Sequence, residues 1–321
     1  MNVTVFLVRL LVLGVILING WTDAPNAIAT AVGSGCLTFR QGVWLAAVCN
    51  FAGAALAALL CPAVAATVGD LIAFPGGQWA ALTALVAAML SILAWSTLAW
   101  RFGLPTSESH ALVAALSGAA LALGSSAARF RADAWARVGL GLVLSLLVGA
   151  LGGRWAWHWL QGRQCSAKAW LRLSAGAMAA LHGAQDGQKF MALLLLADGL
   201  GGGSQAPLLP MALLCAGVMA LGTAMGGAPI VEKIGTEITP LTPKDALAAD
   251  LGAGVCLLGC TVLGLPVSTS HTKVAAICAV GRCRGRDAVS LRPILEIVSA
   301  WALTFPACAL LAYLLTLFML G

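Results

Sequence analysis

Two short polar motifs, each occurring twice about half a chain apart, hold the residues best suited to chemistry in this sequence. The first is Gly20-Trp-Thr-Asp23-Ala-Pro-Asn26-Ala, with the second copy Gly183-Ala-Gln-Asp186-Gly-Gln-Lys189-Phe. The other is Gly103-Leu-Pro-Thr-Ser107-Glu-Ser109-His110, with the second copy Gly264-Leu-Pro-Val-Ser268-Thr-Ser270-His271. A carboxylate among apolar residues is expensive in lipid. A pair at matching positions therefore predicts a binding site where two membrane repeats meet.

The aspartate motifs carry hard oxygen ligands. Gly20 and Pro25 interrupt an apolar helical run, and proline frees a backbone carbonyl one turn earlier. Backbone exposed at membrane depth is tolerated where it lines a cavity or is buried in protein. Asp23, Asn26 and the freed carbonyls suit Na⁺ or a proton. The alternative is a polar contact between helices, and the recurrence of the motif favours the ion site.

The second copy of this motif predicts the same kind of site. It offers Asp186, Gln185 and Gln188 at related places, and we expect the helix to be interrupted over 183–189.

The hydroxyl motifs predict two helix starts. Gly-Leu-Pro followed by hydroxyl residues caps orphan backbone N–H groups before an apolar helix. A helix N-terminus in a cavity binds oxyanions, so two facing ends would surround a tetrahedral anion. Plain N-capping is the alternative. The hydroxyl residues expected to hold the anion are Thr106, Ser107, Ser109, Ser268, Thr269 and Ser270.

Three titratable residues lie beside these hydroxyls. His110 and His271 close the two motifs, as structural hydrogen-bonding residues or as proton carriers and gates. Glu108 is a candidate proton acceptor of the coupling machinery.

Composition excludes a soluble protein. The chain is 60% hydrophobic and 9% charged, with mean hydropathy +0.95, whereas soluble domains carry about 25% charged residues. The apolar runs are too long for barrel strands. The net charge of +6 lies mainly in loops and sets orientation, so no nucleic-acid partner is expected. The ten cysteines fit packing positions without metal spacing.

These features predict an all-α polytopic membrane protein in a lipid bilayer, with broken helices at the binding motifs. Ten apolar stretches align as five per half, and an odd number makes the repeats inverted. The stretches 104–127 and 265–281 could instead be re-entrant. We expect repeat 1 over 1–160, a connecting loop over 161–172 and repeat 2 over 173–321, as one integrated transport domain. Basic loop residues favour both termini outside; the loop with Arg129, Arg131 and Arg137 is the exception.

The four motifs together resemble the inorganic phosphate transporter family, usually called PiT. Its signature is a duplicated Gly-Ala-Asn-Asp-Val-x-Asn-Ala motif paired with a duplicated Pro-x-Ser-Thr-Thr-His motif. The resemblance covers nearly the whole chain. It implies a secondary active, ion-coupled uptake of phosphate across the cytoplasmic membrane by alternating access, with Na⁺ or H⁺ as coupling ion and no other cofactor. It also implies inverted repeats and is compatible with a homodimer.

The chain departs from this signature at positions in and around the expected ion-binding motifs. Gln185 and Lys189 stand where asparagines are usual, Thr22 replaces an asparagine, and Glu108 replaces a threonine. Lys189 lies three residues from Asp186, on the same face of a helical turn. We hypothesise that its ammonium replaces one bound cation or contacts phosphate directly. Asp23 and Asp186 would be the Na⁺ ligands if coupling is to sodium.

Other functions fit parts of the sequence. A sulfate permease of the same fold differs only in its tetrahedral anion, and a metal-phosphate complex is a further candidate substrate. An intramembrane enzyme would need unlike environments for its catalytic groups. Here both motifs recur with similar chemistry, and no HExxH, GxSxG or P-loop motif occurs. A passive channel would show no concentrative uptake.

Overall fold

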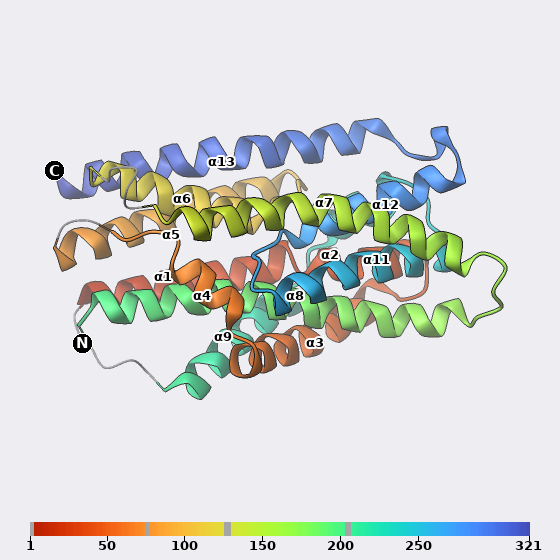
Figure 1. Cartoon of the computed structure of the whole chain (residues 1–321), viewed down its shortest axis with the longest axis horizontal. Coiled ribbons are helices and arrows are strands. Elements are labelled where there is room, and N and C mark those ends of the chain that lie inside the picture. The colour runs from red at the N-terminus through yellow and green to blue at the C-terminus, as the bar shows by residue number, and fades with distance from the viewer. Residues whose placement is uncertain (1–2, 75–76, 125–129, 203–206) are drawn as a thin grey trace.

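The computed structural model describes residues 3–74, 77–124, 130–202 and 207–321. Arg129 and the end of the 104–127 stretch lie outside these ranges. The described chain is a bundle of helices with their long axes roughly aligned (Figure 1). The first half contains α1 (Val3–Thr22), α2 (Pro25–Gly33), α3 (Phe39–Leu60), α4 (Ala63–Gly69), α5 (Gln78–Arg101), α6 (Glu108–Ala122) and α7 (Ala132–Leu160).

The second half repeats this order of long and short elements. It contains α8 (Ala167–Leu200), α9 (Leu208–Ala224), α10 (Ala228–Glu232), the π-helical turn η2 (Lys233–Glu237), α11 (Pro243–Val262), α12 (Thr269–Arg284), the 3₁₀ turn η3 (Arg286–Ala288) and α13 (Leu291–Leu320). α8 corresponds to α1 with α2, and α12 corresponds to α6. The match of elements agrees with a duplicated architecture.

Helices of each half pack against helices of the other half. α1 packs against α9, and its counterpart α8 packs against α3. In the same way α5 and α6 pack against α13, while α11 and α12 pack against α7. Each long helix of one half is therefore covered by helices of the other half.

Several helices have the length and apolar character of membrane spans. Among the described residues six qualify, namely Val3–Gly33 (α1 with α2), Phe39–Leu60, Gln78–Arg101, Ala132–Leu160, Pro243–Val262 and Leu291–Leu320. The pair of α9 with α10 and η2, bent by 74°, makes a seventh if it is one span. The chain is thus a multi-pass membrane protein.

The helices that follow the hydroxyl motifs are short in both halves. α6 has 15 residues and α12 has 16. At about 1.5 Å per residue each is roughly 22–24 Å long, less than the roughly 30 Å hydrocarbon core. Neither helix is long enough to cross the bilayer alone, and the residues at both helix starts are buried in the protein.

The two aspartate motifs have different backbones. In the first, α1 ends at Thr22 and α2 begins at Pro25, so the helix is broken at Asp23 as expected. The second motif lies within the continuous 34-residue helix α8, and the interruption expected over 183–189 is absent. The physical reason is that this copy has no proline, and glycine alone weakens a helix without removing a backbone donor.

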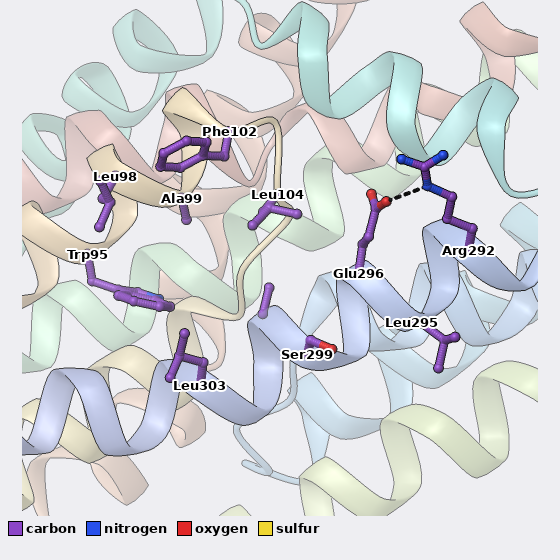
Figure 2. Close-up of a pocket in the computed structure, with 11 residues that line it drawn as sticks. Trp95, Leu98, Ala99, Phe102, Leu104, Arg292, Leu295, Glu296, Ser299 and Leu303 are labelled. Carbon is purple, nitrogen blue, oxygen red and sulfur yellow. Dashed lines mark hydrogen bonds and ion pairs between the residues drawn. The ribbon is translucent and has the colours of Figure 1, made fainter.

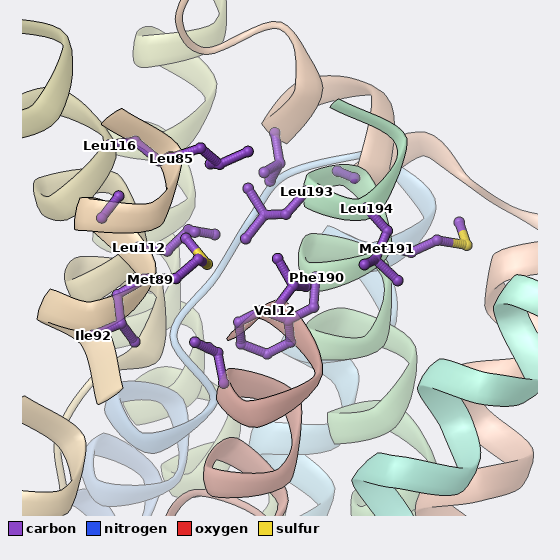
Figure 3. Close-up of a cluster of buried hydrophobic side chains, with 14 of the residues drawn as sticks. Val12, Leu85, Met89, Ile92, Leu112, Leu116, Phe190, Met191, Leu193 and Leu194 are labelled. Atoms are coloured by element: carbon purple, nitrogen blue, oxygen red, sulfur yellow. The ribbon is translucent and has the colours of Figure 1, made fainter. Parts of the chain in front are cut away.

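A large apolar core lies next to the second aspartate motif and the first hydroxyl motif. Figure 3 shows side chains from α1, α5, α6 and α8 meeting there, among them Val12, Met89, Leu112 and Phe190. All four are fully or almost fully buried. Core packing of this kind holds α6 against α5 and α13, and α5 also contacts α8.

α1 begins and α13 ends at the same end of the molecule (Figure 1). Arg131, in the loop that broke the charge pattern, lies 3.8 Å from Asp70 and 3.1 Å from Asp133. These acidic neighbours offset part of the charge of Arg131.

Candidate functional site

The two motif aspartates meet inside the protein. Asp23, His182 and Asp186 each offer an atom to a group whose members lie within 4.8 Å of one another, and all three residues are buried. His182 Nε2 lies 3.4 Å from Asp186 Oδ2 and 4.0 Å from Asp23 Oδ2. The break between α1 and α2 therefore faces the middle of α8 across a shared acidic cluster.

Asp23 is held by groups from both halves. Asn26 Nδ2 donates to Asp23 Oδ1, and Thr269 Oγ1 on α12 donates to Oδ2 at 3.1 Å. Among the described residues its one charged or titratable neighbour of opposite sign within 4.0 Å is His182. A buried carboxylate with neutral donors around it is a site for a mobile cation or a proton.

Asp186 is paired with a lysine side chain instead. Lys189 Nζ lies 2.6 Å from Asp186 Oδ1, and Asn19 Nδ2 donates to Oδ2 at 2.9 Å. Lys189 Nζ also donates to Ser109 Oγ at 2.7 Å and to the carbonyl of Val267 at 2.7 Å. The predicted pairing on one helical face is therefore present, and it extends to the hydroxyl motifs of both halves.

The two hydroxyl motifs also meet. Ser109 Oγ donates to the carbonyl of Val267 at 2.9 Å, and Ser270 Oγ donates to the carbonyl of Thr106 at 2.8 Å. Val267 and Thr106 are equivalent positions of the two motifs. The starts of α6 and α12 are thus linked by a reciprocal pair of hydrogen bonds, with the aspartates beside them.

Two of the predicted hydroxyls cap their own helices. Ser107 Oγ accepts from the N–H of His110, and Ser268 Oγ accepts from the N–H of His271, both at 3.3 Å. Ser268 Oγ also lies 3.1 Å from Ser270 Oγ. Capping by these serines holds the first turns in register, while the hydroxyls of Ser109, Thr269 and Ser270 reach across the interface.

The two motif histidines contact each other. The ring centroids of His110 and His271 lie 4.8 Å apart, and His271 packs on Trp301 of α13 at 3.8 Å. Both ring nitrogens of His271 and Nδ1 of His110 are buried without a hydrogen-bond partner. The pair lies where the two helix starts approach, beside the aspartate cluster and not within it.

Two other predicted residues have neighbouring roles. Glu108 is buried and accepts a hydrogen bond from Ser96 Oγ on α5 at 2.8 Å. Gln185 donates to Thr261 Oγ1 at 3.0 Å and to the carbonyl of Leu265 at 3.3 Å, which fastens the loop before α12 to α8. In the described structure neither side chain forms a hydrogen bond with Asp23 or Asp186.

The sequence analysis missed three residues of this cluster. His182 lies four residues before Asp186, one helical turn away, and its Nδ1 contacts Asn50 Oδ1 at 3.1 Å. Asn19 precedes Gly20 directly, as His182 precedes Gly183. This shared position before each motif glycine is the signal that would have found both; Asn50 has no such signal.

A second buried ion pair lies beside the end of the first aspartate motif. Lys273 Nζ on α12 bonds to Asp250 Oδ1 on α11 and, at 3.3 Å, to the carbonyl of Ala27 on α2. Asp250 also accepts from Thr30 Oγ1 at 2.7 Å and from Ser174 Oγ at 2.8 Å. This network joins α2, α8, α11 and α12.

A cavity of about 680 Å³ opens elsewhere, between the end of α5 and the start of α13 (Figure 2). Its lining is mostly apolar, with Trp95, Phe102 and Leu303 among the side chains, and one ion pair between Arg292 and Glu296 at 3.1 Å. It shares no residue with the aspartate cluster. A mostly apolar lining offers few groups to replace the water around a phosphate ion.

Fold and site together define a multi-pass membrane transporter with a polar site where its two halves meet. Comparison with known proteins specifies the family. The phosphate transporter family matches residues 19–163 and again residues 161–312. The chain belongs to the phosphate transporter family.

Relatives support the same assignment. A probable low-affinity inorganic phosphate transporter from Rhizobium meliloti (strain 1021) is 35% identical, covering 92% of this chain and 91% of the relative. One described in the same words from Bacillus subtilis (strain 168) is 30% identical, covering 92% and 90%.

A solved structure has the same fold. It is described as the sodium-dependent phosphate transporter, and it superposes with a TM-score of 0.87 over 99% of each chain at 18% identity. The descriptions of the family and of these relatives name phosphate as the transported ion, so the sulfate alternative is not favoured.

Proposed function

We propose that this chain is a secondary active symporter that moves inorganic phosphate with Na⁺ or H⁺ by alternating access. The observation that carries this proposal is the meeting of Asp23 and Asp186 with the two hydroxyl helix starts in one buried cluster. Carboxylates supply cation sites, and helix starts with hydroxyls supply an anion site. A cation and phosphate bound side by side offset each other's charge in a low-dielectric interior.

We assign roles to the predicted residues on this basis. Asp23, Asn26 and Asp186 form the cation side, with His182 between the carboxylates. The hydroxyls of Thr106, Ser109, Thr269 and Ser270 face the anion side, and Ser107 and Ser268 hold the two helix starts. Gln185 supports the loop that carries Val267, Glu108 supports α6 from behind, and His110 with His271 form a gate between the motifs.

The transport cycle follows from the exchange of partners between the halves. Because the binding groups lie on helices of both repeats, 1–160 and 173–321, a rocking motion of the repeats opens the cluster to one side at a time. In the structure the cluster is closed, since Asp23 is 4% exposed and Asp186 and Lys189 are each 1% exposed. The polar side chains bond to one another in this state.

We further propose the setting of this activity. The chain would lie in the cytoplasmic membrane with both termini outside, with the 161–172 loop inside. It would act as a transporter without a catalytic reaction and without another cofactor. A homodimer is compatible with this architecture.

Labelled phosphate uptake by the purified protein in liposomes tests this function. Inward Na⁺ and H⁺ gradients are imposed separately, and excess sulfate or a metal-phosphate complex is added as competitor. We expect concentrative phosphate uptake driven by one of the two gradients and little competition by sulfate. Uptake that never exceeds the external phosphate concentration under either gradient would indicate a channel and contradict the proposal.

A further inference from the structure

Lys189 is one of the almost fully buried side chains of the site. It is 1% exposed, in the middle of a helix that crosses the core of the protein. Burying an ammonium costs several kcal/mol unless its charge and all its protons are paired. An –NH₃⁺ group has three donors and no acceptor.

The three protons of Lys189 meet three oxygens. They are a carboxylate oxygen of Asp186 at 2.6 Å, the hydroxyl of Ser109 at 2.7 Å and the carbonyl of Val267 at 2.7 Å. Carboxylate, hydroxyl and carbonyl oxygens are the ligands that a hard metal cation takes from a protein. The ammonium therefore occupies the centre of a ligand set suited to a small cation.

The other half contains the equivalent set without the ammonium. The positions equivalent to Asp186, Ser109 and Val267 are Asp23, Ser270 and Thr106, as the motif alignment shows. Ser270 Oγ donates to the carbonyl of Thr106 at 2.8 Å, as Ser109 does to Val267 at 2.9 Å, and Thr269 beside it donates to Asp23. The position of Lys189 is taken by Asn26, whose short amide bonds to Asp23 and carries no charge.

We infer that Lys189 is a built-in cation that fills one of two equivalent cation positions, so that this transporter needs only one mobile cation, at Asp23, for the pair of aspartates. This inference rests on the proposed symport function. Two carboxylates and one ammonium leave a single negative charge for a mobile cation to neutralise. Glu108 accepts a hydrogen bond from Ser96 and is hydrogen-bonded to none of the three charged groups in the described residues.

The inference predicts the number of cations moved per phosphate. In proteoliposomes with a fixed membrane potential, that number follows from the Na⁺ or H⁺ gradient that stops net phosphate flux. Lys189→Asn places the residue of the first motif in the second and opens the position at Asp186. We expect the ratio to rise by one cation per phosphate in Lys189→Asn, and the dependence of uptake on cation concentration to become steeper.

Controls separate this result from damage to the protein. Lys273→Met removes the other fully buried lysine, which lies in the Asp250 network. It should leave the ratio of the wild-type protein unchanged, whatever its rate. If Lys189→Asn does not fold, the cation-to-phosphate ratio of the wild-type protein still tests the inference. A ratio of two or more cations per phosphate would overturn it.

An equal ratio in the wild-type protein and in Lys189→Asn would overturn it as well. Either result leaves phosphate symport intact. By contrast, a wild-type protein that accumulates no phosphate under any gradient would refute the proposed function itself.

Discussion

The two motif aspartates have the same chemistry and different partners. Asp23 is surrounded by neutral donors and His182, whereas Asp186 is paired with Lys189 at 2.6 Å. Removing one partner of a buried ion pair strands the other charge, which costs about 3–5 kcal/mol. Replacing a carboxylate that has no such partner leaves no stranded charge. The two positions should therefore respond differently to the same substitution.

We expect Asp23→Asn to lower ion-coupled phosphate uptake about 100-fold or more, with a thermal midpoint close to that of the wild-type protein. The amide keeps an oxygen that accepts hydrogen bonds but loses the charge that attracts the coupling ion. Asp198→Asn is the matched control, since Asp198 is another buried aspartate, on α8, paired with Arg9 at 2.6 Å outside the site. It should retain uptake. Normal coupled uptake in Asp23→Asn would contradict the role of Asp23.

Asp186→Asn should lose uptake and also stability. The variant strands the Lys189 ammonium, and we expect the free energy of unfolding to fall by about 3–5 kcal/mol. Thermal unfolding in detergent measures this difference. A double variant with Lys189→Met should recover most of the stability and none of the coupled uptake. A thermal midpoint of Asp186→Asn equal to that of Asp23→Asn would show that the ion pair contributes nothing.

At the scale of elements, the sequence predicted the positions of the binding motifs better than the backbone around them. Pro25 predicted the break at Asp23, because proline removes a backbone N–H donor and displaces the carbonyl one turn earlier in the helix. The second copy lacks proline, and the expected break became a continuous helix. Within this regular helix the side chains of Lys189 and Asp186 lie on one face and form an ion pair at 2.6 Å.

The cluster partners outside the motifs were harder to predict. Asn50 reaches His182 from α3, and its amide also donates to Thr223 of α9 at 2.8 Å. Such contacts depend on how helices distant in sequence cross, and no local spacing encodes that. The fold class followed from hydropathy alone, whereas the short lengths of α6 and α12 required the structure.

The Lys273–Asp250 network should stabilise the arrangement of four helices. Both side chains are fully buried, so Lys273→Met should lower the free energy of unfolding by about 3–5 kcal/mol by leaving Asp250 unpaired. Adding Asp250→Leu to that variant should restore much of the loss, because two apolar side chains replace the pair. Thermal unfolding of both variants in detergent checks this. A single variant as stable as the wild-type protein would contradict it.

At the scale of the whole molecule, close helix crossings hold the two halves together at the motifs. A Cβ atom on Gly183 would lie 2.2 Å from the carbonyl of Asn50 on α3, and one on Gly20 would lie 2.2 Å from the carbonyl of Met219 on α9. Real Cβ atoms do not approach a backbone oxygen so closely. These crossings explain why each aspartate motif begins with glycine.

Gly183→Ala should therefore force α8 away from α3. We expect a loss of about 2 kcal/mol or more in stability, since backbone cannot move aside as a side chain can. Gly199→Ala on the same helix is the control, because nothing lies within 4 Å of its Cβ position. It should be neutral or stabilising by up to about 1 kcal/mol. Equal thermal midpoints for the two variants would refute the crossing argument.

The orientation of the molecule can be read from a native cysteine. Cys165 is exposed, in the segment that joins α7 to α8, while the other nine cysteines are buried or partly buried. If both termini lie outside, a membrane-impermeant maleimide should label Cys165 only after the cells are permeabilised. Cys165→Ser should abolish that labelling. Labelling of intact cells at Cys165 would reverse the proposed orientation.

The exchange of partners between the halves has a consequence for biosynthesis. α1 leaves the ribosome early, but the helix that covers it, α9, ends at Ala224. Until α9 has been inserted into the bilayer, α1 lacks its contacts with α9, and Gly20 is not packed against Met219. We therefore expect a chain truncated before α9 to be degraded rather than to accumulate as a stable fragment.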